Sequence, residues 1–153
     1  MKKLIILVLV FFFSSGIVLA KEKIIVSGGG QTDCGTLSVL VIAEANDEGD
    51  GFMLKGHVTF ITADGDLFRA KDFRLFWPLL NYKGDSWIAI GGFGYFEDGN
   101  EVPFVLGLSD KWQQTDYIAI QIEEVYYCGD DDNYQELNGN ITWNTNVKNI
   151  KGN

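Results

Sequence analysis

Helical periodicity and histidine are both scarce in this chain, and each shortage argues against a class of structure or chemistry. The 153 residues include two prolines and a single histidine, His57. After residue 20, apolar and polar residues alternate between turn signals, which predicts strands and not helices. A serine-hydrolase triad needs a histidine beside a serine nucleophile, and the chain has no Gly-x-Ser-x-Gly elbow. We therefore interpret His57 as a polar residue on a strand face.

A long apolar run occurs once, at the start of the chain. Two lysines precede the unbroken apolar residues 4–13, and Val18 and Ala20 fit the −3 and −1 positions of a cleavage site. Residues 1–20 are therefore predicted to be a signal peptide, which makes the protein secreted or periplasmic. The alternative is an uncleaved anchor, because residues 4–20 approach the roughly 20 apolar residues of a spanning helix. No cysteine lies directly after the run, so a lipoprotein anchor is not supported.

Basic residues are few relative to acidic ones. The chain has 12 lysines and arginines against 21 acids, a net charge of −9. Removing the two signal-peptide lysines leaves 10 basic residues against the same 21 acids, so residues 21–153 carry a charge of −11. Such a surface repels nucleic acid and anionic lipid head groups. The 133 residues left after removing 20 from 153 predict one domain with no linker.

Only two cysteines are present, Cys34 and Cys128, and both lie after the signal peptide. Export places them where thiols tend to be oxidised, so we predict a disulfide between them. In the chain-entropy model a loop of nearly domain length would stabilise the fold by roughly 4 to 5 kcal/mol. Two separate buried thiols are the alternative. A zinc site is not expected, because these cysteines and the lone histidine lack the local spacing of tetrahedral ligands.

Alternating patterns separated by short turns predict about eight or nine strands. Apolar residues define one face at residues 37–43, 102–108 and 118–122. Asp-Gly steps in two of the connections predict hairpin turns. Pro78 is expected to end the strand that precedes it, since it removes a backbone donor. Because several strands have one clear apolar face, the prediction is an all-β chain folded as an antiparallel β-sandwich.

Six short motifs are spread over most of the chain. They are Ser27-Gly28-Gly29-Gly30, Gly56-His57-Val58-Thr59-Phe60, Ala89-Ile90-Gly91-Gly92, Pro103-Phe104-Val105-Leu106-Gly107-Leu108-Ser109-Asp110, Asp116-Tyr117-Ile118-Ala119-Ile120 and Leu137-Asn138-Gly139-Asn140-Ile141. Their order resembles the secreted post-COAP domain, a β-sandwich module of uncharacterised function in exported bacterial proteins. Residues 111–114 lack a Gly-rich step associated with that family, and the cysteine pair is an addition. The resemblance implies a non-catalytic accessory module and transfers no functional residue.

Acidic side chains suit hydrolysis only where they converge. A glycosidase needs two carboxylates about 5 to 9.5 Å apart across a cleft. Glu123 and Glu124 are neighbours on a predicted strand and point to opposite faces, so they cannot form this pair. Carboxylates from different loops are not excluded by the sequence. A small carboxylate- or metal-dependent hydrolase is therefore the alternative to a non-enzymatic function.

One acidic segment has the composition of a calcium-binding loop. Asp130, Asp131, Asp132 and Asn133 bring four oxygen-bearing side chains together, and calcium takes oxygen ligands. The ligand spacing of an EF-hand is missing. The segment is therefore predicted either to bind calcium or to be a solvated acidic turn beside the disulfide, and no other cofactor is expected.

The tryptophans suggest a contact surface. Trp112 lies in a predicted loop, where an exposed indole can stack on a sugar ring, whereas most tryptophans of a small sandwich belong to its core. Asn140-Ile141-Thr142 matches a glycosylation acceptor, but in a predicted strand we interpret it as chance. We expect an exported, non-enzymatic domain for surface display, adhesion or recognition. Its expected partner is a cell-surface glycan or an envelope protein.

Overall fold

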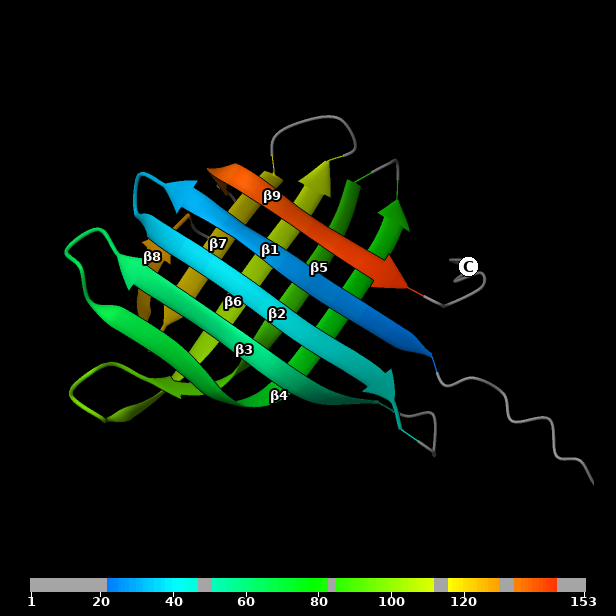
Figure 1. The fold of residues 1–153 in the computed structure, drawn as a ribbon, viewed down its shortest axis with the longest axis horizontal. Coiled ribbons are helices and arrows are strands. Elements are labelled where there is room, and N and C mark those ends of the chain that lie inside the picture. The colour runs from blue at the N-terminus through cyan, green and yellow to red at the C-terminus, as the bar shows by residue number, and fades with distance from the viewer. Residues whose placement is uncertain (1–21, 47–50, 83–84, 112–115, 130–133, 146–153) are drawn as a thin grey trace, which may run out of the picture.

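The computed structural model describes residues 22–46, 51–82, 85–111, 116–129 and 134–145, and these form strands and turns without a helix (Figure 1). The strands are β1 Lys23–Thr32, β2 Gly35–Ala45, β3 Phe52–Thr62, β4 Leu67–Tyr82, β5 Asp85–Tyr95, β6 Glu101–Lys111, β7 Asp116–Ile122, β8 Val125–Cys128 and β9 Gln135–Thr145. The predicted signal peptide lies outside the described residues. Within the described ranges, no helix has the length and apolar character needed to cross a membrane.

The strands pair in chain order from β1 to β7, and every pairing is antiparallel. The sheet closes through β9, which pairs with β1 over residues 138–145 and with β7 over residues 135–137. Eight strands thus form a closed barrel. The short strand β8 is a ninth, added beside β9 along the edge of β7.

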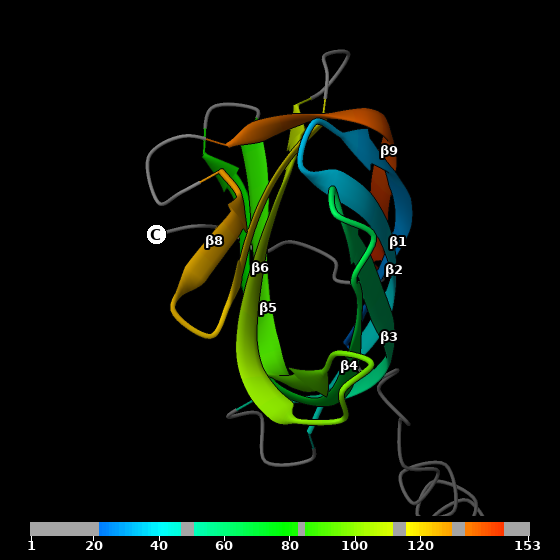
Figure 2. The same cartoon turned by 90° about the vertical axis from the view of Figure 1, so that its left-hand side faces the viewer.

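The all-β class and the number of strands agree with the sequence prediction, but the closure does not match the predicted sandwich. The sixteen-residue strand β4 pairs with β3 at its start and with β5 along the rest of its length. Its register against β5 shifts between Ala70 and Asp72 and again between Phe73 and Leu75. Such bulges bend a strand and increase its twist, so the sheet curls until its edges meet. Figure 2 shows the resulting elongated ring of strands.

The interior of the barrel is filled by one side of each strand. The predicted apolar faces are confirmed: Leu37, Val39, Val41 and Ala43 on β2, Val102, Phe104, Leu106 and Leu108 on β6, and Ile118, Ile120 and Ile122 on β7 are all buried. The fully buried Phe68 contacts Phe96 and Phe104 edge-to-face, with ring centroids 5.5 and 5.4 Å apart. Burying a side chain of this size stabilises the fold by about 1.5 to 3 kcal/mol.

Two local predictions were wrong. Pro78 does not end its strand, because β4 continues to Tyr82 and Pro78 is paired with Ile88. The pairing of β3 with β4 is confined to residues 67–69, so the edge of β4 near Pro78 has no β3 partner to lose. Glu123 and Glu124 do not lie on a strand but form the exposed turn between β7 and β8.

Two glycines allow β1 and β9 to approach closely where β9 passes from β7 to β1. Gly30 lies opposite Gly139 in the strand register. A Cβ atom on Gly139 would lie 2.1 Å from the carbonyl oxygen of Gly29 and 2.5 Å from the Cα atom of Gly30. Both are backbone atoms that cannot move without opening the pair, so a side chain at this position would separate the strands.

The disulfide joins the barrel to its extra strand. Cys34 lies in the turn between β1 and β2, Cys128 ends β8, and their Cα atoms are 5.5 Å apart. The structure thus places the predicted cysteine pair at disulfide distance, across 94 positions of the chain. Cys128 is 2% exposed and belongs to the core. The bond therefore fixes β8 against the β1–β2 turn.

The two ends of the described chain leave the barrel together. Ile24 near the start of β1 pairs with Thr145 at the end of β9, and Gln31 pairs with Asn138 at the opposite end of the same two strands. Figure 1 shows β1 beginning and β9 ending on the same side of the barrel. The β1–β2 turn and its surroundings therefore lie at the far end from both termini of the described part.

A candidate ligand groove at the barrel seam

Two predicted site regions, Trp112 and the calcium segment of Asp130, Asp131, Asp132 and Asn133, lie outside the described residues. Among the residues that are described, no group of three or more histidine, cysteine or acidic side chains could hold a metal ion. The calcium site thus stays a prediction. A higher melting temperature in millimolar calcium than in chelator would support it, because a ligand that binds only the folded state stabilises that state.

His57 lies on the outer face of β3, opposite Leu40 of β2, and both side chains are exposed. Val58 and Phe60 point to the interior, as the alternation predicts. His57 does not line the groove described below. The structure therefore places His57 on a strand face, as expected.

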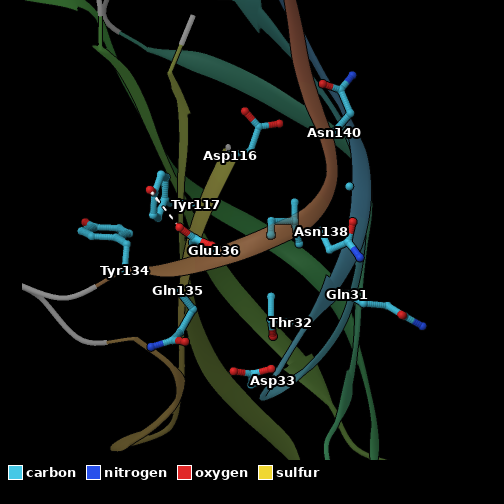
Figure 3. Close-up of a pocket in the computed structure, with 12 residues that line it drawn as sticks. Gln31, Thr32, Asp33, Asp116, Tyr117, Tyr134, Gln135, Glu136, Asn138 and Asn140 are labelled. Carbon is cyan, nitrogen blue, oxygen red and sulfur yellow. Dashed lines mark hydrogen bonds between the residues drawn. The ribbon is translucent and has the colours of Figure 1, made fainter. Parts of the chain in front are cut away.

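A groove of about 1150 Å³ lies at the seam where β9 passes from β7 to β1. Its first wall is the end of β1 and the following turn, with Gln31, Thr32 and Asp33. Its second wall is the start of β7, with Asp116 and Tyr117. The residue before β9 and the first part of β9 supply the rest: Tyr134, Gln135, Glu136, Leu137, Asn138, Gly139 and Asn140. Figure 3 shows the polar side chains of all three segments around Glu136.

The groove follows from how the barrel closes. Only residues 135–137 of β9 pair with β7, whereas residues 138–145 pair with β1. Where β9 changes its pairing partner from β7 to β1, the β7–β9 ladder ends, and polar side chains line the space beside it. Asn138 and Asn140 of β9 are both exposed there. The short pairing between β7 and β9 thus leaves a polar groove at this end of the barrel.

Asp116 bridges the seam where the ladder stops. Its Oδ2 accepts a hydrogen bond from the backbone N–H of Ile141 at 2.6 Å. Asp116 is 6% exposed and Ile141 is 1% exposed, so the bond is shielded from water. Hydrogen bonds to charged acceptors are stronger than neutral ones. Asp116 therefore replaces a missing ladder bond between β7 and β9.

The other two carboxylates of the groove are more open to solvent. Glu136 is exposed, and its Oε1 accepts a hydrogen bond from the Tyr117 hydroxyl at 3.4 Å. Asp33 is exposed in the β1–β2 turn. Figure 3 shows Asp116 above and Asp33 below Glu136. Two accessible carboxylates and one buried carboxylate therefore line the groove.

Thr32 connects the groove wall formed by the end of β1 and the following turn to the disulfide. Its Oγ1 lies 2.9 Å from Sγ of Cys34 and 3.2 Å from Sγ of Cys128. The backbone N–H of Cys34 donates to the same hydroxyl at 3.1 Å. This local turn, together with the disulfide, holds Asp33 in position at the edge of the groove.

Charge pairs lie at the other end of the barrel. Glu44 near the end of β2 is 3.3 Å from Nζ of Lys55 and 3.5 Å from Nζ of Lys23. The hydrogen bond and charge of Lys55, with a smaller contribution from Lys23, lower the pKa of the Glu44 carboxyl below its ordinary value. This cluster is remote from the groove, because Lys23 and Glu44 pair at the start of β1.

Comparison with family models, with curated proteins and with solved structures finds no match for this chain. The resemblance to the post-COAP domain thus remains an expectation based on short motifs.

Sequence reasoning did not identify the groove, although it used several of its residues for other arguments. Asn140 belongs to a glycosylation triplet and to one of the family motifs, and Asp116 belongs to another of these motifs. The groove combines residues 31–33 with residues 134–140, and only the closure of the barrel brings these segments together. The available signal was the polar pattern Asn138-Gly139-Asn140 inside an otherwise alternating strand.

Proposed function

We propose that this chain is an exported, non-enzymatic recognition domain, and that the groove at the seam binds an uncharged polyhydroxylated ligand. The signal-peptide pattern and the Cys34–Cys128 disulfide support a place outside the cytoplasm. The ligand class is inferred from the composition of the groove, which is lined by amide, hydroxyl and carboxylate side chains from three segments.

Amide side chains suit a ligand rich in hydroxyl groups. Gln31, Gln135, Asn138 and Asn140 each offer both donors and an acceptor, and a sugar hydroxyl both donates and accepts. The groove carboxylates add acceptors for ligand hydroxyls, whereas they repel phosphate and carboxylate groups. The charge of −11 on residues 21–153, from 10 basic residues against 21 acids, acts in the same direction.

Binding of neutral glycans to residues 21–153, on an array and by calorimetry, tests this proposal. Asn138→Ala removes an exposed groove amide and is expected to weaken binding about tenfold, since lost hydrogen bonds in a binding site cost about 1 to 2 kcal/mol. Ser38→Ala is the matched control, because Ser38 is an exposed polar strand residue outside the groove. Failure to bind any glycan, or equal effects of the two variants, would refute the proposal.

A hydrolase is the second candidate, because Asp33, Asp116 and Glu136 line one recess. Asp116 already accepts the Ile141 N–H bond, so Asp33 and Glu136 are the pair available for acid–base chemistry. Reducing-sugar release from the bound glycan, abolished in Glu136→Gln with binding retained, would favour this candidate. Binding without any release would exclude it for that glycan.

A further inference from the structure

An apolar hollow adjoins the groove on the outer face of β4, β5 and β6. It has a volume of about 380 Å³ and is lined by Leu75, Trp77, Trp87, Ala89, Gly107 and Tyr134, with Ile88 behind them. We call these six residues the aromatic shelf. Trp77 and Trp87 therefore line an outer surface, although most tryptophans of a small β-domain are expected in its core.

The strand register explains why small residues lie at the centre of the shelf. Trp77 pairs with Ala89, Ala89 with Gly107, and Gly107 with Ala119, which gives a row of small residues beside one indole. Leu75 lies opposite Gly91, which in turn lies opposite Val105, in the next row on the same face. Large side chains thus stand at the sides of a floor made by glycine and alanine.

The side chains around this floor are strongly exposed. Trp77 is 61% exposed, Leu75 39% and Val105 44%. An isolated exposed apolar residue is ordinary on a protein surface, but a contiguous group that includes an indole marks an interaction site. The exposed indole at the rim can lie against a flat apolar surface of a ligand.

Tyr134 connects the shelf to the groove. It lines both of them, and its ring centroid lies 4.4 Å from that of Trp87. A Cβ atom on Gly107 would lie 3.2 Å from the Tyr134 ring, so the tyrosine covers part of the shelf floor. The groove and the aromatic shelf therefore meet at the Tyr134 side chain.

We infer that the groove and the aromatic shelf form one site for an uncharged oligosaccharide chain. The groove binds the hydroxyl groups of one part of the oligosaccharide, and Trp77 stacks on a sugar ring of another part of the oligosaccharide, beyond Tyr134. The inference rests on the proposed function and adds the length of the ligand to it. A sugar ring has an apolar C–H face and a rim of hydroxyl groups, so a glycan presents both chemistries that adjoin here. A purely apolar partner would leave the groove amides without bonds.

The experiment compares short and long chains of the same sugars. Calorimetry on residues 21–153 uses dimers and hexamers of neutral glucose- and N-acetylglucosamine-based oligosaccharides. A hexamer that reaches the shelf is expected to bind at least about tenfold more tightly than its dimer, because it buries an additional aromatic surface. Trp77→Ala is expected to remove this advantage and to leave dimer binding unchanged.

Two further variants separate the possible outcomes. Tyr126→Ala removes a 41% exposed aromatic ring on β8 outside the shelf, and it is expected to leave both affinities unchanged. If Asn138→Ala weakens binding of both lengths while Trp77→Ala changes neither, the inference is overturned and the proposed function stands. If no length binds, both are overturned.

A second copy of the chain is the competing occupant of the shelf. Sedimentation of the wild type and of Trp77→Ala decides between the two. Self-association of the wild type that Trp77→Ala abolishes would overturn the oligosaccharide inference, whereas equal sedimentation of the two proteins agrees with it.

Discussion

Replacing Asp116 by alanine would test how the barrel is held closed at its shortest seam. The substitution removes the acceptor of the 2.6 Å bond from Ile141 and leaves that N–H group buried, since Ile141 is 1% exposed. A hydrogen bond to a charged group contributes about 1.5 to 3 kcal/mol, and an unpaired buried donor costs a similar amount. We therefore expect Asp116→Ala to lower the free energy of unfolding by about 2 to 3 kcal/mol.

Urea unfolding followed by tryptophan fluorescence measures this loss. With a slope of roughly 1.5 to 2 kcal/mol per molar urea, the midpoint should fall by about 1 to 2 M. Asp116→Asn keeps a carbonyl acceptor and should lose about 1 kcal/mol. Asp33→Ala is the control, because Asp33 lines the same groove but is exposed, and its loss should stay within about 0.5 kcal/mol. Equal, small losses for Asp116→Ala and Asp33→Ala would refute the role of Asp116 as a bridge across the seam.

Three further predictions concern the disulfide, the close approach of two strands and the charged cluster. Replacing Cys34 and Cys128 together by serine should cost about 4 to 5 kcal/mol, because the bond spans 94 residues; two alkylated thiols in the unreduced wild type would contradict the pairing. Gly139→Ala should destabilise the fold by at least ~3 kcal/mol or prevent folding, because the new Cβ atom would lie 2.1 Å from a backbone oxygen. Gly51→Ala is the control and should be tolerated, since the nearest atom to its Cβ would be 3.7 Å away. Similar melting temperatures of the two variants would disprove this reasoning. Because the pKa of Glu44 is lowered in the folded state, its contribution is present above the ordinary pKa and is lost as the pH falls through the lowered value. As the pH is lowered through this range, the melting temperature of Glu44→Gln should therefore decrease less steeply than that of the wild type. Parallel decreases of the two melting temperatures would contradict this prediction.

The sequence predicted the local structure better than the way the strands join. Alternation with period two identified the buried faces of β2, β6 and β7, because it depends only on neighbours along the chain. Whether such strands form two sheets or one closed ring depends on long-range register. Here the shifts within β4 and the double use of β9 decide the outcome. Neither leaves a pattern that a single sequence reveals.

The candidate site was harder to predict for the same reason. Its walls come from segments about a hundred residues apart, and Asp116 gains its role only when β9 lies beside β7. The aromatic shelf was missed because an apolar residue on an outer face and one in the core look alike in sequence. Trp77 follows two register shifts of its strand, and after such shifts alternation no longer distinguishes the two faces.

The pairing of β1 with β9 decides how this domain could be attached to something else. Ile24 and Thr145 lie opposite each other, seven pairs away from Gln31 and Asn138 at the groove, which is roughly 23 Å along a strand. A bead, a label or a carrier protein joined at residue 22 or residue 145 would be attached at the end of these two strands that lies away from Gln31 and Asn138. For the same reason, a short linker between the two ends, with new ends opened at an exposed turn such as Asp98–Asn100, would give a permuted domain whose groove keeps all three of its walls.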